Sequence, residues 1–205
     1  EIQQKIGYLP GEICFPDDMT GIAYLHLISR MRSTRDFSFA KSLINIFEFD
    51  PNIKIRKMSK GMKQKLGIVA AFMHNPDILL LDEPTSGLDP LMQSRFIDLI
   101  QSEKEKGKTI LLSSHIFDEV EKTCDRVVMI RNGRLIRQIT VKEMKDAQYK
   151  TYKIGFNKES DIATFALMYP NSEIDKNGKF AIVSITDSEL NRLIHTLSQY
   201  EIAFF

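Results

Sequence analysis

The 205-residue sequence has no tryptophan, only two cysteines and almost no net charge, with 28 Lys and Arg against 27 Asp and Glu. Cys14 and Cys124 lie far apart, without the spacing of a metal site or a redox motif. This favours reduced thiols in a cytosolic protein over a disulfide framework. The sequence shows neither a signal peptide nor an apolar run long enough to cross a bilayer. The balanced charge gives no electrostatic argument for a nucleic-acid or anionic-lipid partner.

Strands and helices alternate along the first two thirds of the sequence, which predicts an α/β fold with a mainly parallel sheet. Expected strands cover residues 2–9, 78–81 and 109–112, and expected helices cover residues 20–32, 38–47, 59–73, 89–107 and 116–124. Thr20, Ser38, Ser59 and Asp89 stand where a helix cap is expected. The continuous apolar run Ile78–Leu81 is typical of a parallel strand that is covered on both faces. Two further strands, 126–130 and 134–138, flank a hairpin turn.

The pattern changes after about residue 150. Expected strands at 152–156, 173–175, 180–185 and from 201 onward are interrupted by expected helices at 161–169 and 188–200. This β-α-β-β-α-β order is the ferredoxin-like arrangement, an α+β fold. We therefore expect a first domain at residues 1–148 and a small ferredoxin-like domain at 149–205. Its last strand would be truncated, leaving Phe204 and Phe205 exposed at a sheet edge.

Two adjacent carboxylates, Asp82 and Glu83, follow the apolar run Ile78–Leu81. In an open α/β sheet, ligands bind at the carboxyl ends of the strands. Neighbouring residues on a strand point to opposite sides, so the two carboxylates can have different roles. One can support a hydrated Mg²⁺ ion, and the other can polarise an attacking water molecule. The alternative is a solvated loop after a core strand.

Four motifs in this order resemble those of the ABC ATPases, over about residues 1–140. Asp82-Glu83 resembles the Walker B motif, and Ser86-Gly-Leu-Asp89 resembles the D-loop. Met58-Ser-Lys-Gly-Met62 is similar to the signature Leu-Ser-Gly-Gly-Gln, from which it departs at Lys60 and Met62. Ser113-Ser-His115, after an expected strand, is similar to the switch-histidine motif. The resemblance implies the family's fold, with residues 13–57 as its helical subdomain.

The resemblance also implies roles for single residues in ATP hydrolysis. Asp82 would support Mg²⁺, Glu83 would be the general base, and His115 would contact the γ-phosphate. The signature segment would serve the ATP held by an opposite subunit, in a homodimer or a pair of ATPase subunits. The residues implied in nucleotide binding are Ser59, Lys60, Gly61 and Asp89. The alternatives are a plain helix cap for Ser59 and a structural histidine for His115.

Tyr8-Leu-Pro-Gly-Glu12 resembles the Q-loop region, which links the nucleotide site of the family to its membrane partner. Gly11 stands where the usual glutamine is expected. Glu12 is the nearest polar substitute and a candidate to approach Mg²⁺ or water, with a merely solvated side chain as the alternative.

A phosphate-binding loop of the form Gly-x-x-x-x-Gly-Lys-[Ser/Thr] is missing from the sequence. Gly107-Lys108-Thr109 fails the pattern because Ser102 occupies the position of the first glycine and a strand is expected to follow. In the ABC family this loop precedes the Q-loop, so it would lie upstream of Glu1. The domain is then incomplete, and we expect this chain to bind ATP weakly or not at all.

The resemblance implies that the intact protein hydrolyses ATP at the inner face of the cell membrane and drives a separate transmembrane permease. The signature variant and the small C-terminal domain are similar to the exporter-type branch. Such a subunit would be cytoplasmic and peripheral to the membrane, with ATP and Mg²⁺ as cofactors and no nucleic-acid partner. The alternatives are a non-transport ABC ATPase and a regulatory pseudo-ATPase.

Overall fold

The computed structural model describes residues 2–34, 36–146, 149–175 and 180–205. The chain forms two compact units, Glu1–Thr123 and Cys124–Phe205. The domain boundary expected at residues 148 and 149 stays a prediction, and residues 147–148 lie outside the described part of the chain. The compact units divide earlier than this, before the expected hairpin. Each unit is described separately.

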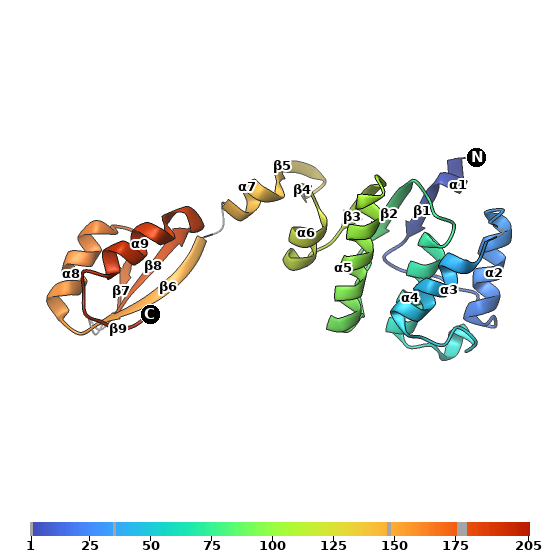
Figure 1. Cartoon of the computed structure of the whole chain (residues 1–205), viewed down its shortest axis with the longest axis horizontal. Helices are drawn as coiled ribbons and strands as arrows, with labels where there is room; N and C mark the ends of the chain where they lie inside the picture. Colours follow the sequence, from blue (N-terminus) through green and yellow to red (C-terminus); the bar gives the residue numbers. More distant parts are fainter. Residues whose placement is uncertain (1, 35, 147–148, 176–179) are drawn as a thin grey trace. The chain divides into compact units, whose positions relative to one another are not determined.

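A three-stranded parallel sheet is the centre of the first unit, with the strand order β1-β2-β3 (Figure 1). The strands are β1 (Ile6–Leu9), β2 (Ile78–Asp82) and β3 (Thr109–Ser113). The expected parallel sheet is confirmed, but the strand expected from residue 2 is wrong, because Ile2–Lys5 form a short helix, α1. The first residue of β2, Ile78, pairs with Ile6, so residues before Ile6 have no partner in β2.

The other helices of this unit begin and end close to the expected positions. They are α2 (Gly21–Met31), α3 (Ser38–Phe47), α4 (Lys60–Phe72), α5 (Pro90–Glu105) and α6 (Phe117–Thr123), with a 3₁₀ turn at Ile55–Lys57. Thr20, Ser59 and Asp89 cap α2, α4 and α5, each accepting a hydrogen bond from the backbone N–H three residues later. The cap expected at Ser38 is wrong. Asp36 lies two residues earlier, and its carboxylate accepts the backbone N–H of Ser38 at 2.8 Å.

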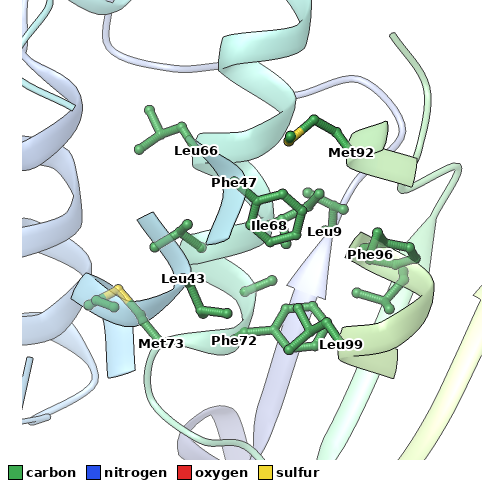
Figure 2. Close-up of a cluster of buried hydrophobic side chains, with 14 of the residues drawn as sticks. Leu9, Leu43, Phe47, Leu66, Ile68, Phe72, Met73, Met92, Phe96 and Leu99 are labelled. Carbon is green, nitrogen blue, oxygen red and sulfur yellow. The ribbon is translucent and has the colours of Figure 1, made fainter. Parts of the chain in front are cut away.

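One face of the sheet is buried under α4 and α5. Figure 2 shows side chains from the strands and helices meeting there, with the rings of Phe47, Phe72 and Phe96 fully buried. Leu79 and Leu81 of β2 point into this core, whereas Ile78 on the opposite face is 36% exposed. Within the first unit, β2 is therefore covered on one face, and the expectation of two covered faces is wrong.

The second unit begins with a hairpin of β4 (Arg126–Arg131) and β5 (Arg134–Thr140), followed by α7 (Val141–Asp146). The turn residues Asn132 and Gly133 have φ of 51° and 70°, as a type I′ hairpin turn requires. The expected hairpin is confirmed.

The rest of the second unit has the expected β-α-β-β-α-β order. Its elements are β6 (Tyr149–Phe156), α8 (Glu159–Met168), β7 (Glu173–Ile174), β8 (Phe180–Thr186), a 3₁₀ turn (Asp187–Glu189), α9 (Leu190–Leu197) and β9 (Ile202–Phe204). The antiparallel sheet order β7-β8-β6-β9 is that of a ferredoxin-like fold. Phe204 and Phe205 are 47% and 61% exposed beside edge strand β9, as expected. In the described part of the chain, no helix is both long and apolar enough to span a bilayer.

Candidate ATP-hydrolysis site

The carboxyl ends of β2 and β3 lie side by side at one edge of the parallel sheet. Asp82, the last residue of β2, pairs in register with Ser113, the last residue of β3. The residues that follow them, Glu83 and Ser114-His115, therefore leave the sheet as neighbours. This is the edge where open α/β sheets bind ligands.

Ser113 holds both carboxylate residues in place. Its hydroxyl donates a hydrogen bond to the carboxylate of Asp82. The backbone N–H of Glu83 lies 3.1 Å from the carbonyl oxygen of Ser113 and 3.2 Å from its hydroxyl oxygen. Glu83 has φ of 46°, so the chain turns sharply where it leaves β2. The register of two strands thus determines where the adjacent carboxylates stand.

Glu83 and His115 are in direct contact, with 2.8 Å between Oε2 of Glu83 and Nδ1 of His115. The carboxylate is 35% exposed and the imidazole 78% exposed, so both are open to a ligand. The hydrogen bond that the Glu83 carboxylate accepts from His115, and then the charge of Glu83, raise the pKa of His115 above its ordinary value. The sequence predicted both residues as catalytic, and the structure brings them together as a pair that can hold a proton.

Asp82 is exposed, and the loop after β1 lies close to it. A Cβ atom added to Gly11 would stand 2.9 Å from Oδ2 of Asp82, so the backbone at the Q-loop position lies against this carboxylate. Glu12, next in the chain, is exposed. Among the described residues, no group of three or more His, Cys, Asp or Glu side chains can hold a metal alone. Mg²⁺ fits this edge nevertheless, because it commonly binds one or two carboxylates together with substrate phosphates.

The signature segment, Met58–Met62, lies against the D-loop, Ser86–Asp89, of the same chain. A Cβ atom on Gly61 would stand 2.8 Å from the carbonyl oxygen of Gly87, and one on Gly87 would stand 3.2 Å from the Lys60 side chain. Ser59, expected at the nucleotide, serves as a helix cap and accepts the N–H of Met62 at 3.2 Å. Asp89 likewise caps α5. Ser59, Lys60 and Asp89 are exposed.

Comparisons with known proteins show the family to which the chain belongs. Residues 17–120 match a family model described as "AAA domain, putative AbiEii toxin, Type IV TA system". The uncharacterized ABC transporter ATP-binding protein YthP of Bacillus subtilis (strain 168) is 39% identical over 148 residues, which are 69% of this chain and 62% of YthP. The chain belongs to the ABC-type ATPases.

Two solved structures show the same fold. An ATP-binding subunit of an ABC transporter is 31% identical, with a TM-score of 0.62 over 70% of this chain and 62% of its own. The dimeric bacterial ABC transporter cassette MJ0796 is 22% identical, with a TM-score of 0.62 over 68% of this chain and 65% of its own, and shows the fold alone. The chain thus spans about three fifths of the length of relatives such as YthP.

Gln64 of this ABC ATPase is a site residue to which the sequence gave no role. It lies on α4, is 4% exposed, and its amide group donates to the carbonyl oxygens of Glu83 at 3.3 Å and Pro84 at 2.8 Å. Helix α4 is thereby tied to the backbone at Glu83, the predicted general base. The available signal was a polar residue four positions before Ile68, on the apolar side of the expected helix.

Replacing Gln64 with leucine should lower the free energy of unfolding by about 1–3 kcal/mol, because the buried carbonyl group of Pro84 loses this donor and that of Glu83 keeps the N–H of Ser86. Urea denaturation followed by circular dichroism measures this loss. Lys65→Leu, one position along the same helix at a partly exposed site, is the control and should change stability by less than about 0.5 kcal/mol. Equal stability of Gln64→Leu and the wild type would show that these hydrogen bonds contribute nothing.

Proposed function

We propose that the protein binds and hydrolyses ATP as the nucleotide-binding subunit of an ABC transporter. The observation that carries the proposal is the contact between Glu83 and His115 beside Asp82, at the carboxyl edge of a parallel sheet. Hydrolysis needs a base for water, a polar group at the γ-phosphate and a carboxylate near Mg²⁺. These three groups stand on neighbouring strand ends.

Each of these residues has one role in the proposed reaction. Glu83 accepts a proton from the attacking water, and His115 orients the same water and donates a hydrogen bond to the γ-phosphate. Asp82 would hold Mg²⁺ through its water shell, and the bound cation would neutralise charge on the phosphates. Glu12 lies next to Gly11, which is close to Asp82, and approaches the cation or its water from the loop after β1.

A second subunit completes the site in this proposal. Ser59, Lys60 and Gly61 begin α4, and the free N–H groups at a helix N-terminus favour an anion. These residues would act on the ATP held by the opposite subunit, with Asp89 of the D-loop at the same junction. The dimeric state of the MJ0796 cassette supports this arrangement through the fold alone.

The transport role is proposed from the relatives, which are named as ABC transporter ATP-binding proteins. The helical region at about residues 13–57 would dock on a transmembrane permease, which places the subunit at the cytoplasmic face of the cell membrane. The exporter-type assignment rests on the signature variant and the small C-terminal domain. The near-zero net charge supports the absence of a nucleic-acid partner.

Co-expression of the full-length protein with a candidate transmembrane permease tests this role. The expected result is recovery of the protein with the membrane and an ATP hydrolysis rate that depends on Glu83. Hydrolysis by a protein that stays off the membrane would favour a non-transport ABC ATPase. Binding to the membrane without hydrolysis would favour a regulatory pseudo-ATPase.

The 205-residue chain itself should bind ATP with a dissociation constant above about 1 mM. This corresponds to a binding free energy of less than about 4 kcal/mol in magnitude. The reason is the missing phosphate-binding loop, whose backbone N–H groups and lysine hold the phosphates. Isothermal titration calorimetry with Mg²⁺ and ATP measures this, with YthP as the positive control. A micromolar dissociation constant for this chain would contradict the prediction.

A further inference from the structure

Glu119 is a buried acidic residue that the proposed reaction does not use. It lies on α6 and is 2% exposed. Burying a carboxyl group is costly unless hydrogen bonds compensate for the lost water. The burial of Glu119 in the first unit therefore needs a structural explanation.

The carboxylate of Glu119 joins the two chain segments that carry the catalytic residues. Its Oε2 atom accepts a hydrogen bond from the hydroxyl of Ser114, the residue before His115. The same atom lies 3.4 Å from the hydroxyl of Thr85, two residues after Glu83. One oxygen atom thus holds the segment that follows β2 and the segment that follows β3.

Both of these segments are further ordered by the residues that Glu119 holds. The hydroxyl of Ser114 accepts the backbone N–H of Ile116 at 3.0 Å, which fixes the turn around His115. The carbonyl oxygen of Thr85 accepts the N–H of Leu88 at 3.0 Å, which closes the turn of the D-loop. Moving Glu119 would therefore move the D-loop and the switch histidine together.

The second oxygen atom of Glu119, Oε1, is buried and has no hydrogen-bond partner among the residues that the structure describes. Glu119 also lines a cavity of about 380 Å³ between α5 and α6, together with Gln93, Asp98, Gln101 and Lys122. The cavity wall combines these polar groups with apolar ones such as Ile97 and Ile116, and the cavity has room for water. Burial raises the pKa of Glu119, and the hydrogen bonds from Ser114 and Thr85 oppose this effect. The residue is held in place by its two hydroxyl donors rather than by an ion pair.

We propose that Glu119 is a positioning residue that links the D-loop to the switch segment and so sets His115 against Glu83. The proposal rests on the proposed function for the roles of His115 and Glu83. It adds a physical connection between the D-loop, against which the signature segment packs, and the pair Glu83 and His115. Through this connection, a displacement of the D-loop would change the contact between Glu83 and His115. Since Gly61 contacts Gly87, the connection begins at the segment that would serve the opposite subunit.

The four histidines of the 205-residue chain make an NMR titration practical. The imidazole signal of His115, assigned with His115→Gln, reports its contact with Glu83 without any need for ATP hydrolysis. The pKa of His115 in the wild-type chain should lie above its ordinary value. In Glu119→Met, which keeps the side-chain size but has no oxygen acceptor, the pKa of His115 should fall back toward its ordinary value.

Glu119→Gln separates the effect of positioning from that of charge, because both Glu83 and Glu119 act electrostatically on His115. The glutamine oxygen still accepts from Ser114 and Thr85, so the pKa of His115 should fall only by the small contribution of the Glu119 charge and stay well above that in Glu119→Met. An equal fall in Glu119→Gln and Glu119→Met would overturn the proposal in favour of a simple charge effect. An unchanged titration in Glu119→Met would overturn it as well. Asp118→Asn, an exposed neighbour on α6, is the control.

The full-length protein provides the second readout. Glu119→Met should lower kcat for ATP hydrolysis roughly 10-fold to 100-fold with KM unchanged, since small misplacements of catalytic groups have effects of this size. Glu119→Gln should recover most of this loss. If Glu119→Met does not fold, Thr85→Val and Ser114→Ala each remove one donor, and unchanged kcat in both would overturn the proposal. If the wild-type protein did not hydrolyse ATP, the proposed function would be overturned instead. The NMR titration would still test whether Glu119 positions His115 against Glu83.

Discussion

Glu83→Gln should lower kcat for ATP hydrolysis by about 10²–10⁴-fold, the usual contribution of a general base. Glutamine keeps the size of the side chain but cannot accept the proton of the attacking water. It can still accept a hydrogen bond from His115, so the local structure should persist. A coupled-enzyme assay of the full-length protein at saturating ATP measures kcat directly.

ATP binding should survive this substitution, because the proposed contribution of Glu83 is to the chemical step. The dissociation constant for ATP, measured by calorimetry, should change less than threefold, or about 0.7 kcal/mol. Glu105→Gln, an exposed carboxylate at the end of α5, is the matched control and should leave kcat unchanged. If Glu83→Gln hydrolysed ATP at the wild-type rate, another group would be the base.

Glu103→Ala should lower the free energy of unfolding by about 3–5 kcal/mol, the usual cost of removing one partner of a buried ion pair. Glu103 of α5 is fully buried and pairs with Lys108 and, at 2.7 Å, with Lys106. Without it, the Lys108 side chain, which is 8% exposed, would keep Asn75 as its one side-chain hydrogen-bond partner among the described residues. Urea denaturation measures the loss, and Glu105→Ala on the same helix should cost less than about 0.5 kcal/mol.

The pH dependence of the free energy of unfolding is an independent test of the contribution of Glu103. Burial acts to raise the pKa of Glu103, but hydrogen bonds from Lys106 and Lys108 outweigh it and hold the pKa below the ordinary value of 4.5. A folded pKa below the unfolded one means that the stabilisation is fully present above pH 4.5 and is lost as the pH falls through the folded pKa. The difference in stability between the wild type and Glu103→Ala should therefore shrink on acidification below pH 4.5. A difference that does not change with pH would contradict this account.

The secondary structure could be predicted where local chemistry decides it. Ser59 and Asp89 begin helices because their side chains cap free N–H groups, and Asn132-Gly133 turns a hairpin because both residues tolerate positive φ. Ser38 was predicted as a cap, but it is the first residue of α3, and its backbone N–H is accepted by the carboxylate of Asp36. A cap prediction fails where two polar residues stand within reach of one helix start.

The candidate site could be predicted only in part. Asp82, Glu83 and His115 were found because they follow apolar strands. Gln64 and Glu119 were not, because a polar residue on a helix is usually solvated. Both are buried here, where Gln64 bonds carbonyl groups 19 and 20 residues away and Glu119 bonds the hydroxyl of Thr85, 34 residues away. Contacts between residues this far apart in the sequence leave no local pattern from which they could be predicted.

The sequence by itself determined most of the order of strands and helices, the capped starts of α2, α4 and α5, and the identity of the carboxylates and the histidine. Only the tertiary structure decided that Asp82 pairs with Ser113, that Glu83 contacts His115, and that Glu119 joins Thr85 to Ser114. The physical reason is that the amino-acid pattern encodes each strand separately, whereas the register between parallel strands arises from packing of β2 against its neighbours. That register places the proton acceptor beside the histidine.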